Sequence, residues 1–127
     1  MKYGYSKIVS LPFEEAVSKV TETLSTEGFG VLTTIDVKAT MKKKLDLNYE
    51  NYTILGACNP TFAHKALEAE KEIGLLLPCN VIVYQTGDDV HVSAMLPSAA
   101  MSAVENDAIG NIALEVEKKL RSVIDTM

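Results

Sequence analysis

Hydrophobic residues recur along this chain with periods of about two and about 3.6 residues, which are typical of strands and helices respectively. Segments of the first kind, bounded by turn residues, predict about five strands. These segments are residues 2–9, 29–35, 52–58, 75–84 and 90–95. The fourth is apolar almost throughout, so we expect it to be covered on both faces. Because proline donates no backbone hydrogen bond, Pro78 marks an edge, a bulge or a later strand start.

Helical spacing appears in four segments, and each one follows a residue whose side chain commonly caps a helix. These residues are Ser10, Asp36, Asn59 and Asn106. Proline in the first turn supports the starts after Ser10 and Asn59. We expect the first helix to end at Gly28 and the third to run to about Ala69, with Gly74 marking its end. The last helix presents one apolar face: Ile109, Ile112, Ala113, Val116, Leu120, Val123 and Ile124.

The order of these elements predicts the fold class. A strand and a helix alternate three times, and a hairpin turning at Gly87-Asp88-Asp89 and a final helix follow. This β-α-β-α-β-α-β-β-α order predicts an α+β fold, a two-layer α/β sandwich in which helices pack on a mixed sheet of about five strands. No linker or low-complexity segment divides the chain, so we predict a single domain over residues 1–127.

Composition narrows the classes of partner. The 127 residues are 47% hydrophobic and 23% charged, with a net charge of −5. Because nucleic-acid binding normally needs a basic surface, we expect no nucleic-acid partner. The run Lys42-Lys43-Lys44 is typical of a solvated helix face, and an anion contact is the alternative. No apolar stretch approaches the roughly 20 residues that cross a membrane, and the N-terminus lacks a signal-peptide pattern. With only two cysteines, a cytoplasmic location with free thiols is expected.

Two Cys-Asn pairs form the densest candidate for chemistry. Cys58-Asn59 precedes a predicted helix, and Cys79-Asn80 stands in the next predicted strand. A helix N-terminus favours negative charge and can lower a thiol pKa, which suits a nucleophile or a bound ligand. The structural alternative is that Asn59 only caps the helix and both thiols are small buried side chains. A disulfide between the two cysteines is the least favoured reading.

Further candidates lie on the predicted third helix. At 100° per residue, His64 points to the polar side, whereas Glu70 falls inside the apolar arc. A charge in that arc needs a partner or a raised pKa, unless the helix ends at Ala69 and Glu70 faces water. Neither histidine has the spacing of a zinc site, so no residues are assigned as metal ligands. Phosphate-loop, dinucleotide and serine-nucleophile motifs are missing, and the sequence identifies neither a cofactor nor a catalytic residue.

Three runs of residues resemble a known family. They are Gly28-Phe29-Gly30-Val31-Leu32-Thr33 with residues 35–40, Ile54-Leu55-Gly56-Ala57-Cys58-Asn59-Pro60 with residues 63–70, and residues 72–81. The chain resembles the domain of unknown function 302 family of bacteria and archaea. The resemblance implies a small α/β sandwich that forms a homodimer, and it brings no established reaction. Positions matching the family motifs are Asp36, Lys38, Cys58, Asn59, Pro60, His64, Glu70, Pro78, Cys79 and Asn80. The chain departs from the pattern at Leu96, where an acidic residue is common.

Three functions remain open. The leading prediction is a homodimeric domain that binds a small molecule, an anion or a metal in a polar-lined hollow near Cys58-Asn59 and Cys79-Asn80. Asp36, Lys38, His64 and Glu70 are further candidate ligand-binding residues. The first alternative is a thiol-dependent enzyme or redox protein that uses Cys58 or Cys79, with His64 or Glu70 as proton partner. The second is a dimerisation or docking module, suggested by the apolar segment 75–84 and by Leu114 on the polar side of the last helix.

Overall fold

A computed structural model describes residues 2–127 and contains one five-stranded sheet. The strands stand in the order β1-β5-β4-β3-β2, so the first and second strands of the chain form the two edges. About five strands were expected, and this expectation is confirmed. The strands are β1 (Gly4–Val9), β2 (Gly30–Asp36), β3 (Tyr52–Cys58), β4 (Cys79–Thr86) and β5 (Asp89–Met95).

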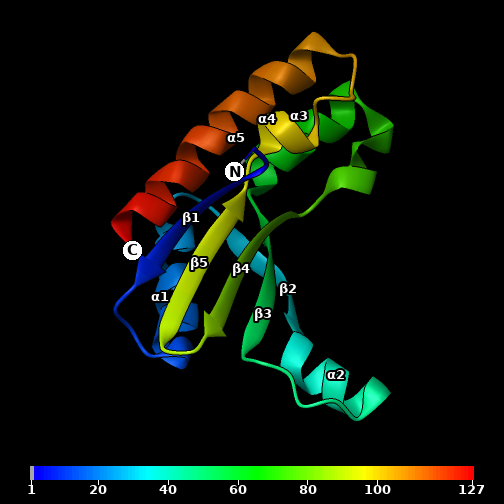
Figure 1. The fold of residues 1–127 in the computed structure, drawn as a ribbon. Coiled ribbons are helices and arrows are strands. Elements are labelled where there is room, and N and C mark those ends of the chain that lie inside the picture. Colours follow the sequence, from blue (N-terminus) through cyan, green and yellow to red (C-terminus); the bar gives the residue numbers. More distant parts are fainter. Residues whose placement is uncertain (1) are drawn as a thin grey trace.

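Helices form a second layer on one face of the sheet and extend past both of its ends. Figure 1 shows α1 and α5 side by side on one face, α3 and α4 at one end, and α2 projecting from the other. This α+β arrangement and its element order confirm the predicted fold class. The helices are α1 (Phe13–Thr26), α2 (Val37–Leu45), α3 (Pro60–Ala69), the 3-10 helix η1 (Lys71–Leu76), α4 (Pro97–Ala100) and α5 (Asp107–Thr126).

The sheet is antiparallel in every strand pair, whereas the sequence predicts a mixed sheet. Two neighbouring strands are parallel only if the connection between them runs back along the sheet to the end where the first strand starts. Here α2 joins β2 to its neighbour β3 at one end of the sheet, and α3 with η1 joins β3 to β4 at the other. Only α1 crosses the sheet, from the β1 edge to the β2 edge. The helices between neighbouring strands are therefore end connections, which leave those strands antiparallel.

Two of the four predicted capping residues cap the helix that follows them. Asp36 Oδ1 accepts a hydrogen bond from the Ala39 N–H at 2.9 Å, and Asn106 Oδ1 accepts one from the Ala108 N–H at 3.0 Å. Ser10 does not cap α1, whose N-cap position is held by Pro12. Asn59 precedes α3 but makes no capping hydrogen bond. Its side-chain amide instead links the start of α3 to the end of α1, as described below.

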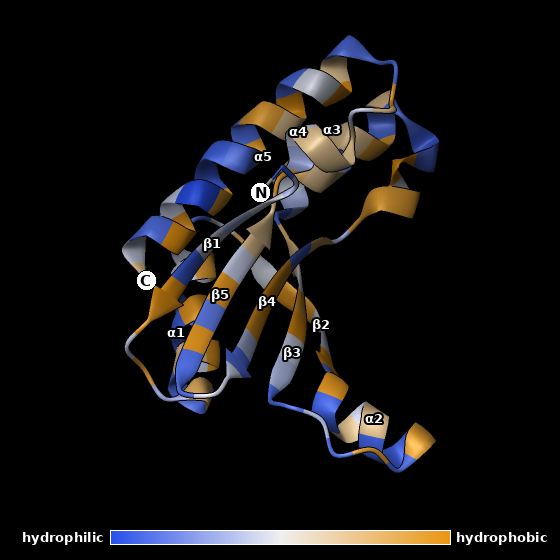
Figure 2. Ribbon diagram, viewed as in Figure 1, coloured by the Kyte–Doolittle hydropathy of each residue, from blue (hydrophilic) through white to orange (hydrophobic). Residues whose placement is uncertain are grey.

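The sheet buries one face only. Along β4, Cys79, Val81 and Val83 are buried, while Asn80 is exposed and Ile82 is half-buried. The apolar segment is thus covered on one face rather than on both as predicted, because α1 and α5 pack on the same side. Orange segments on α1, α5 and the central strands in Figure 2 reflect this shared core. Its largest fully buried side chains include Val20, Leu24, Leu55, Val81, Val83, Val92, Leu120, Val123 and Ile124.

β2 and β3 approach each other closely where β4 begins. A side chain at Gly56 would overlap Thr33 Oγ1 and lie 2.8 Å from Pro78 Cγ. Glycine is therefore required at this point for close packing, not for backbone freedom. Pro78 itself precedes β4, which settles the sequence alternatives in favour of a strand that starts after the proline.

Candidate functional site

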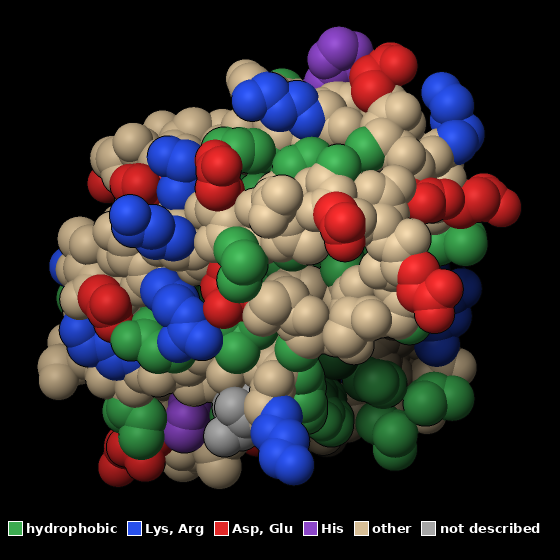
Figure 3. All heavy atoms as spheres, turned by 90° about the horizontal axis from the view of Figure 1, so that it is seen from above, with side chains coloured by type: hydrophobic (Ala, Val, Ile, Leu, Met, Phe, Trp, Pro, Cys, Tyr) green, Lys and Arg blue, Asp and Glu red, His purple; other side chains and the backbone are tan. Residues whose placement is uncertain are grey.

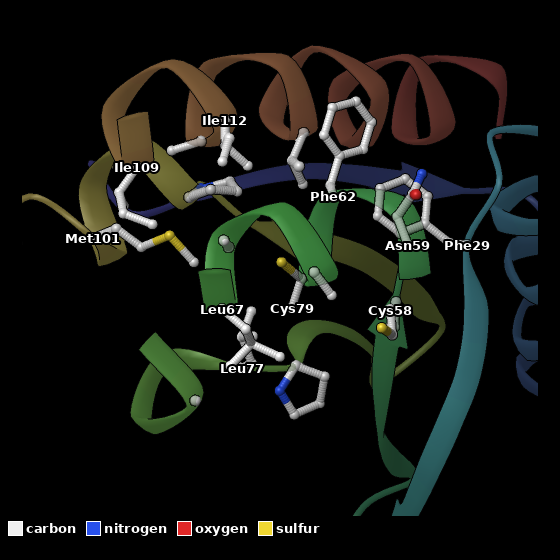
Figure 4. Close-up of a pocket in the computed structure, with 18 of the residues that line it drawn as sticks. Phe29, Cys58, Asn59, Phe62, Leu67, Leu77, Cys79, Met101, Ile109 and Ile112 are labelled. Atoms are coloured by element: carbon white, nitrogen blue, oxygen red, sulfur yellow. The ribbon is translucent and has the colours of Figure 1, made fainter. Parts of the chain in front are cut away.

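An apolar pocket of about 340 Å³ lies where β3 ends and β4 begins. Figure 4 shows side chains from α3, α5, the two strands and the segment after α4 turned toward this space. The pocket-lining residues are Phe29, Leu32, Ala57, Cys58, Asn59, Phe62, Ala63, Ala66, Leu67, Gly74, Leu77, Pro78, Cys79, Pro97, Met101, Ile109, Ile112, Ala113 and Val116.

Local sequence explains how the walls form. Pro60 starts α3 directly after β3, so the apolar stripe of α3 lies beside the strand ends. The same helical spacing on α5 presents Ile109, Ile112 and Ala113 to the space from the opposite side. The segment around Pro97, which the sequence leaves without regular structure, forms the short α4 and brings Met101 to the pocket.

Cys58 and Cys79 both line this pocket, as the shared hollow of the sequence analysis requires. They come close because β3 and β4 pair with Ala57 opposite Cys79. Burial raises the pKa of the Cys79 thiol to about 11, and the neighbouring Cys58 adds to the rise. Cys79 is therefore a neutral thiol at pH 7, and it contributes a small apolar wall rather than a nucleophile.

Asn59 contributes the polar side chain of the pocket lining. Its Nδ2 donates a hydrogen bond to the Glu27 carbonyl oxygen at 3.2 Å, which ties the start of α3 to the end of α1. The adjacent Gly28 has φ +86°, and a Cβ there would lie 3.0 Å from that same Nδ2. Asn59 therefore positions the Gly28 turn against the pocket.

Three other candidate residues lie away from the cysteines. Asn80 points to the uncovered face of the sheet, opposite Gly56. Asp36 ends β2, six residues beyond Gly30, which pairs with Cys58, and Lys38 follows in α2. At about 3.3 Å per residue this separation is roughly 20 Å. Asp36 caps α2, and Lys38 Nζ lies 3.4 Å from Asn51 Oδ1.

His64 and Glu70 also stand outside the lining. His64 is exposed on α3 with its Nε2 3.5 Å from Glu68 Oε1, on the polar side that the helical spacing predicts. α3 ends at Ala69, so Glu70 leaves the apolar arc. Its Oε1 is 3.5 Å from Asn106 Nδ2, which also donates to the Ala69 carbonyl at 2.9 Å. These contacts join α3 to the start of α5 and provide no proton partner for a pocket thiol.

The chemistry of the pocket differs from the polar-lined hollow that the sequence predicts. No lining residue carries a charge. Among residues 2–127 no group of three His, Cys, Asp or Glu side chains is placed to hold a metal ion. Figure 3 views this end of the molecule from above and shows charged side chains at the surface, with hydrophobic ones exposed between them. The geometry therefore favours apolar over ionic contents.

Most of the residues that line the pocket could not be predicted as such from the sequence. Phe62, Ala66 and Leu67 are visible in the sequence as an apolar helix stripe, but that pattern does not separate a pocket wall from a packed core. Met101 lies in an irregular segment without periodicity and carries no sequence signal. The missing information is which elements leave a gap between them.

A buried carboxylate that the sequence analysis does not identify holds α4 at the pocket. Glu117 Oε1 accepts hydrogen bonds from the Ser98 N–H at 3.1 Å and from the Ser98 hydroxyl at 2.5 Å. Arg121 lies 3.4 Å from Glu117 Oε2. Burial acts to raise the pKa of Glu117, but the Ser98 hydrogen bonds and the Arg121 charge outweigh it and lower the pKa. The ionised carboxylate thus fixes the first turn of α4.

Comparisons with known proteins give a family and a fold. The model of a family described as "Domain of unknown function DUF302" matches residues 5–127. A crystal structure of an uncharacterized conserved DUF302 protein from Bacillus stearothermophilus is similar over 98% of each chain, with 29% sequence identity and a TM-score of 0.91. No curated protein matches the chain. Within residues 2–127, none of the helices combines the length and the apolar character that crossing a membrane requires.

Proposed function

Since this chain belongs to the DUF302 family, as its sequence resemblance predicts, and that family's description names no activity, we propose a function from the pocket. The domain binds a small, uncharged, largely apolar molecule between α3, α5 and the adjoining ends of β3 and β4. One observation supports this proposal above the others: a cavity of about 340 Å³ whose lining carries no charged side chain.

Size and lining are those of a ligand site. Pockets for small molecules usually enclose roughly 300–1,000 Å³ and are mainly apolar, with few polar groups. Here Asn59 is the amide at the pocket, and the two thiols are weak hydrogen-bonding groups. Removing apolar surface from water contributes about 25 cal/mol per Å², so burial of the ligand drives binding.

The anion and metal forms of the sequence hypothesis receive no such support. An anion would lose its hydration without gaining a cationic side chain from the pocket lining. The chain's net charge of −5 also repels anions. A thiol enzyme would need an ionised cysteine, and the raised pKa of Cys79 opposes that role for this one of the two thiols. A neutral ligand is the reading that fits the lining.

The test compares two probes that differ in charge. We expect 1-decanol to raise the thermal midpoint and decanoate to leave it unchanged. At a free ligand concentration of 100 times Kd, binding adds about 2.7 kcal/mol, or roughly 10 °C for a chain of this size. Fluorescence of 1-N-phenylnaphthylamine should rise with the protein and fall when decanol displaces the dye. No response to either neutral probe overturns the proposal, and a larger response to decanoate overturns its uncharged character.

A pair of glycine variants localises the binding. A side chain added at Gly74, which lines the pocket, or at Gly110, which does not, would meet no heavy atom within 4 Å. We expect Gly74→Leu to reduce decanol affinity at least about tenfold by occupying pocket space, and Gly110→Leu to leave it unchanged. Equal affinities for both variants would place the decanol elsewhere.

A further inference from the structure

The sheet face that α1 and α5 leave uncovered, here called the open face, contains a second hollow, of about 400 Å³. It lies over β1, β5, β4 and the start of β3, and it shares no lining residue with the apolar pocket. Tyr3, which precedes β1, and Glu50, which precedes β3, complete its lining. Its volume falls within the roughly 300–1,000 Å³ of small-molecule sites. The open face therefore offers a site separate from that of the proposed function.

A pair of serine hydroxyls lies at the base of this hollow. Ser6 on β1 and Ser93 on β5 are opposite each other in the sheet, and their Oγ atoms are 2.6 Å apart. Ser93 is only 8% exposed. Two hydroxyls carry two protons, and only one of these lies between the two oxygens, so the second is available to an acceptor on a ligand. Beside the pair, Ile82 on β4 is opposite Ser93 and supplies an apolar contact.

Two tyrosines from neighbouring strands also line the hollow. The ring of Tyr84 stacks on Tyr52 with centroids 5.4 Å apart and on His91 with centroids 4.5 Å apart. These stacks hold the rings in place before a ligand binds, which lowers the entropy cost of binding. Burial raises the pKa of Tyr52, and neighbouring tyrosines and the Glu50 carboxylate add to the rise. At pH 7 the Tyr52 hydroxyl is therefore neutral and can both donate and accept a hydrogen bond.

The remaining polar groups are a third tyrosine hydroxyl, an amide and a carboxylate, from Tyr3, Asn80 and Glu50. Among the described residues Glu50 is the one charged member of the lining, and its Oε2 accepts a hydrogen bond from the Thr86 hydroxyl at 3.5 Å. Apart from this contact and the serine pair, the polar side-chain atoms of the lining form no hydrogen bond with another group of residues 2–127. Most of these donors and acceptors are therefore available to a ligand.

This set of groups favours one class of ligand. An anion would find no lysine or arginine in the lining, and the chain's net charge of −5 repels it. An organic cation binds best over a ring face, but both faces of Tyr84 are covered by its stacking partners. A purely apolar molecule would remove the hydroxyls from water without replacing their hydrogen bonds. A neutral molecule with several hydroxyls matches donors and acceptors alike, and two of its hydroxyls can donate to one carboxylate.

We propose that the hollow on the open face binds a cyclic, uncharged polyol of the size of a monosaccharide. The hydroxyls of such a ring exchange hydrogen bonds with the serine pair, the tyrosine hydroxyls and the Asn80 amide. Its C–H groups lie against Ile82 and Met95, which also line the hollow. The chain then has two sites with opposite preferences, an apolar pocket between its helices and a hydroxyl-rich hollow on its sheet.

The first test follows backbone amide signals by NMR, with the methyl α-glycopyranosides of glucose, galactose and mannose as probes. We expect at least one of them to shift the signals of Ile82 and Ser93 with a Kd of about 1 mM, which is typical of a ligand of this size. Tetrahydropyran-2-methanol keeps the ring but lacks the ring hydroxyls, so it should leave these two signals unchanged. No shift with any glycoside, or an equal shift with tetrahydropyran-2-methanol, overturns the proposal.

Single substitutions test which groups hold the glycoside. Tyr84→Phe keeps the stacked ring and removes its hydroxyl, and Asn80→Ala removes an exposed amide. Each should raise the Kd of the glycoside at least about threefold, because one hydrogen bond is lost. Tyr49→Phe is the matched control and should leave the Kd unchanged, since Tyr49 is 42% exposed and lies outside the lining. An unchanged Kd in both lining variants, or the same rise in Tyr49→Phe, overturns the assignment.

A competition experiment separates this proposal from the function proposed for the apolar pocket. Saturating 1-decanol should leave the Kd of the glycoside unchanged, and Tyr84→Phe should keep the rise in thermal midpoint that decanol causes. If decanol fails to bind while the glycoside still shifts Ser93, only the function proposed for the apolar pocket is overturned. If decanol displaces the glycoside, the two sites are not separate and the present proposal fails.

Discussion

Both ends of the sheet carry apolar side chains outside the strands, but only one end buries them. At the pocket end, α3, η1, α4 and α5 surround the strands, and Ile73, Ile109 and Ala113 are buried. At the opposite end lie residues 37–51, here called the α2 arm, which contain no buried residue. Leu45 and Leu47 are exposed at this arm end. Hydrophobic sequence alone therefore does not identify a core. What matters is whether other elements of the chain cover that surface.

Truncation of a large side chain gives the greatest expected contrast between the ends. Ile73→Ala at the pocket end should cost about 2–5 kcal/mol in free energy of unfolding, because it leaves a cavity in a fully buried site. Leu45→Ala at the arm end should change the stability of the isolated chain by less than about 0.5 kcal/mol. Urea unfolding of each variant and of the natural chain measures both changes in free energy. Similar losses of unfolding free energy in the two variants would contradict the difference between the two ends.

The dependence of stability on alkaline pH tests whether the Cys79 thiol at the pocket is shielded from water. The pKa of Cys79 is raised to about 11 in the folded chain, above the usual thiol value. Its contribution to stability is complete below the unfolded pKa and is lost as pH rises from about 9 toward 11, on the order of 2–3 kcal/mol. Cys79→Ala should flatten this part of the stability profile, whereas Cys58→Ala should keep most of it. An identical slope in Cys79→Ala would show that the thiol is hydrated.

Two carboxylates, one near the pocket and one in the arm, should give a smaller difference in stability between the two ends. Glu117→Gln should destabilise the chain by about 1–2 kcal/mol, because it removes the charge-assisted hydrogen bonds to Ser98. Asp46→Asn in the arm should cost less than about 0.5 kcal/mol, because its pair with Lys42 is exposed.

The pH dependence of Glu117 has a definite sign. Its pKa is lowered on folding, so its contribution is present above the unfolded pKa and is lost as pH falls through the folded pKa. The free energy of unfolding, measured at decreasing pH for the natural chain and for Glu117→Gln, gives this contribution. Parallel profiles for the two proteins would contradict it.

Local features were predictable from the sequence because the groups involved are close along the chain. Asp36 and Asn106 cap their helices through N–H groups two or three residues away. Asn59 has the same local pattern, yet its amide donates to Glu27, 32 residues earlier. The end of α1 offers that carbonyl only after the sheet has brought α1 and α3 together. A local rule therefore fails where a distant acceptor competes.

The candidate site divides in the same way. The alternation of a strand shows that Cys79 and Asn80 point to opposite faces, but not which face is buried. That choice depends on α1 and α5 packing on the same side. The pairing of β3 with β4 brings Cys58 beside Cys79, whereas Asp36 remains at the other end of its strand.

By itself, the sequence determined the family, the element order and most helix and strand boundaries, because periodicity, capping and turn residues act over a few positions. The tertiary structure alone decided that the sheet is antiparallel, that the hollow is apolar and that one sheet face and the α2 arm lack a covering layer. These features depend on which distant elements pack together and where they leave a gap. No pattern within one segment encodes that packing.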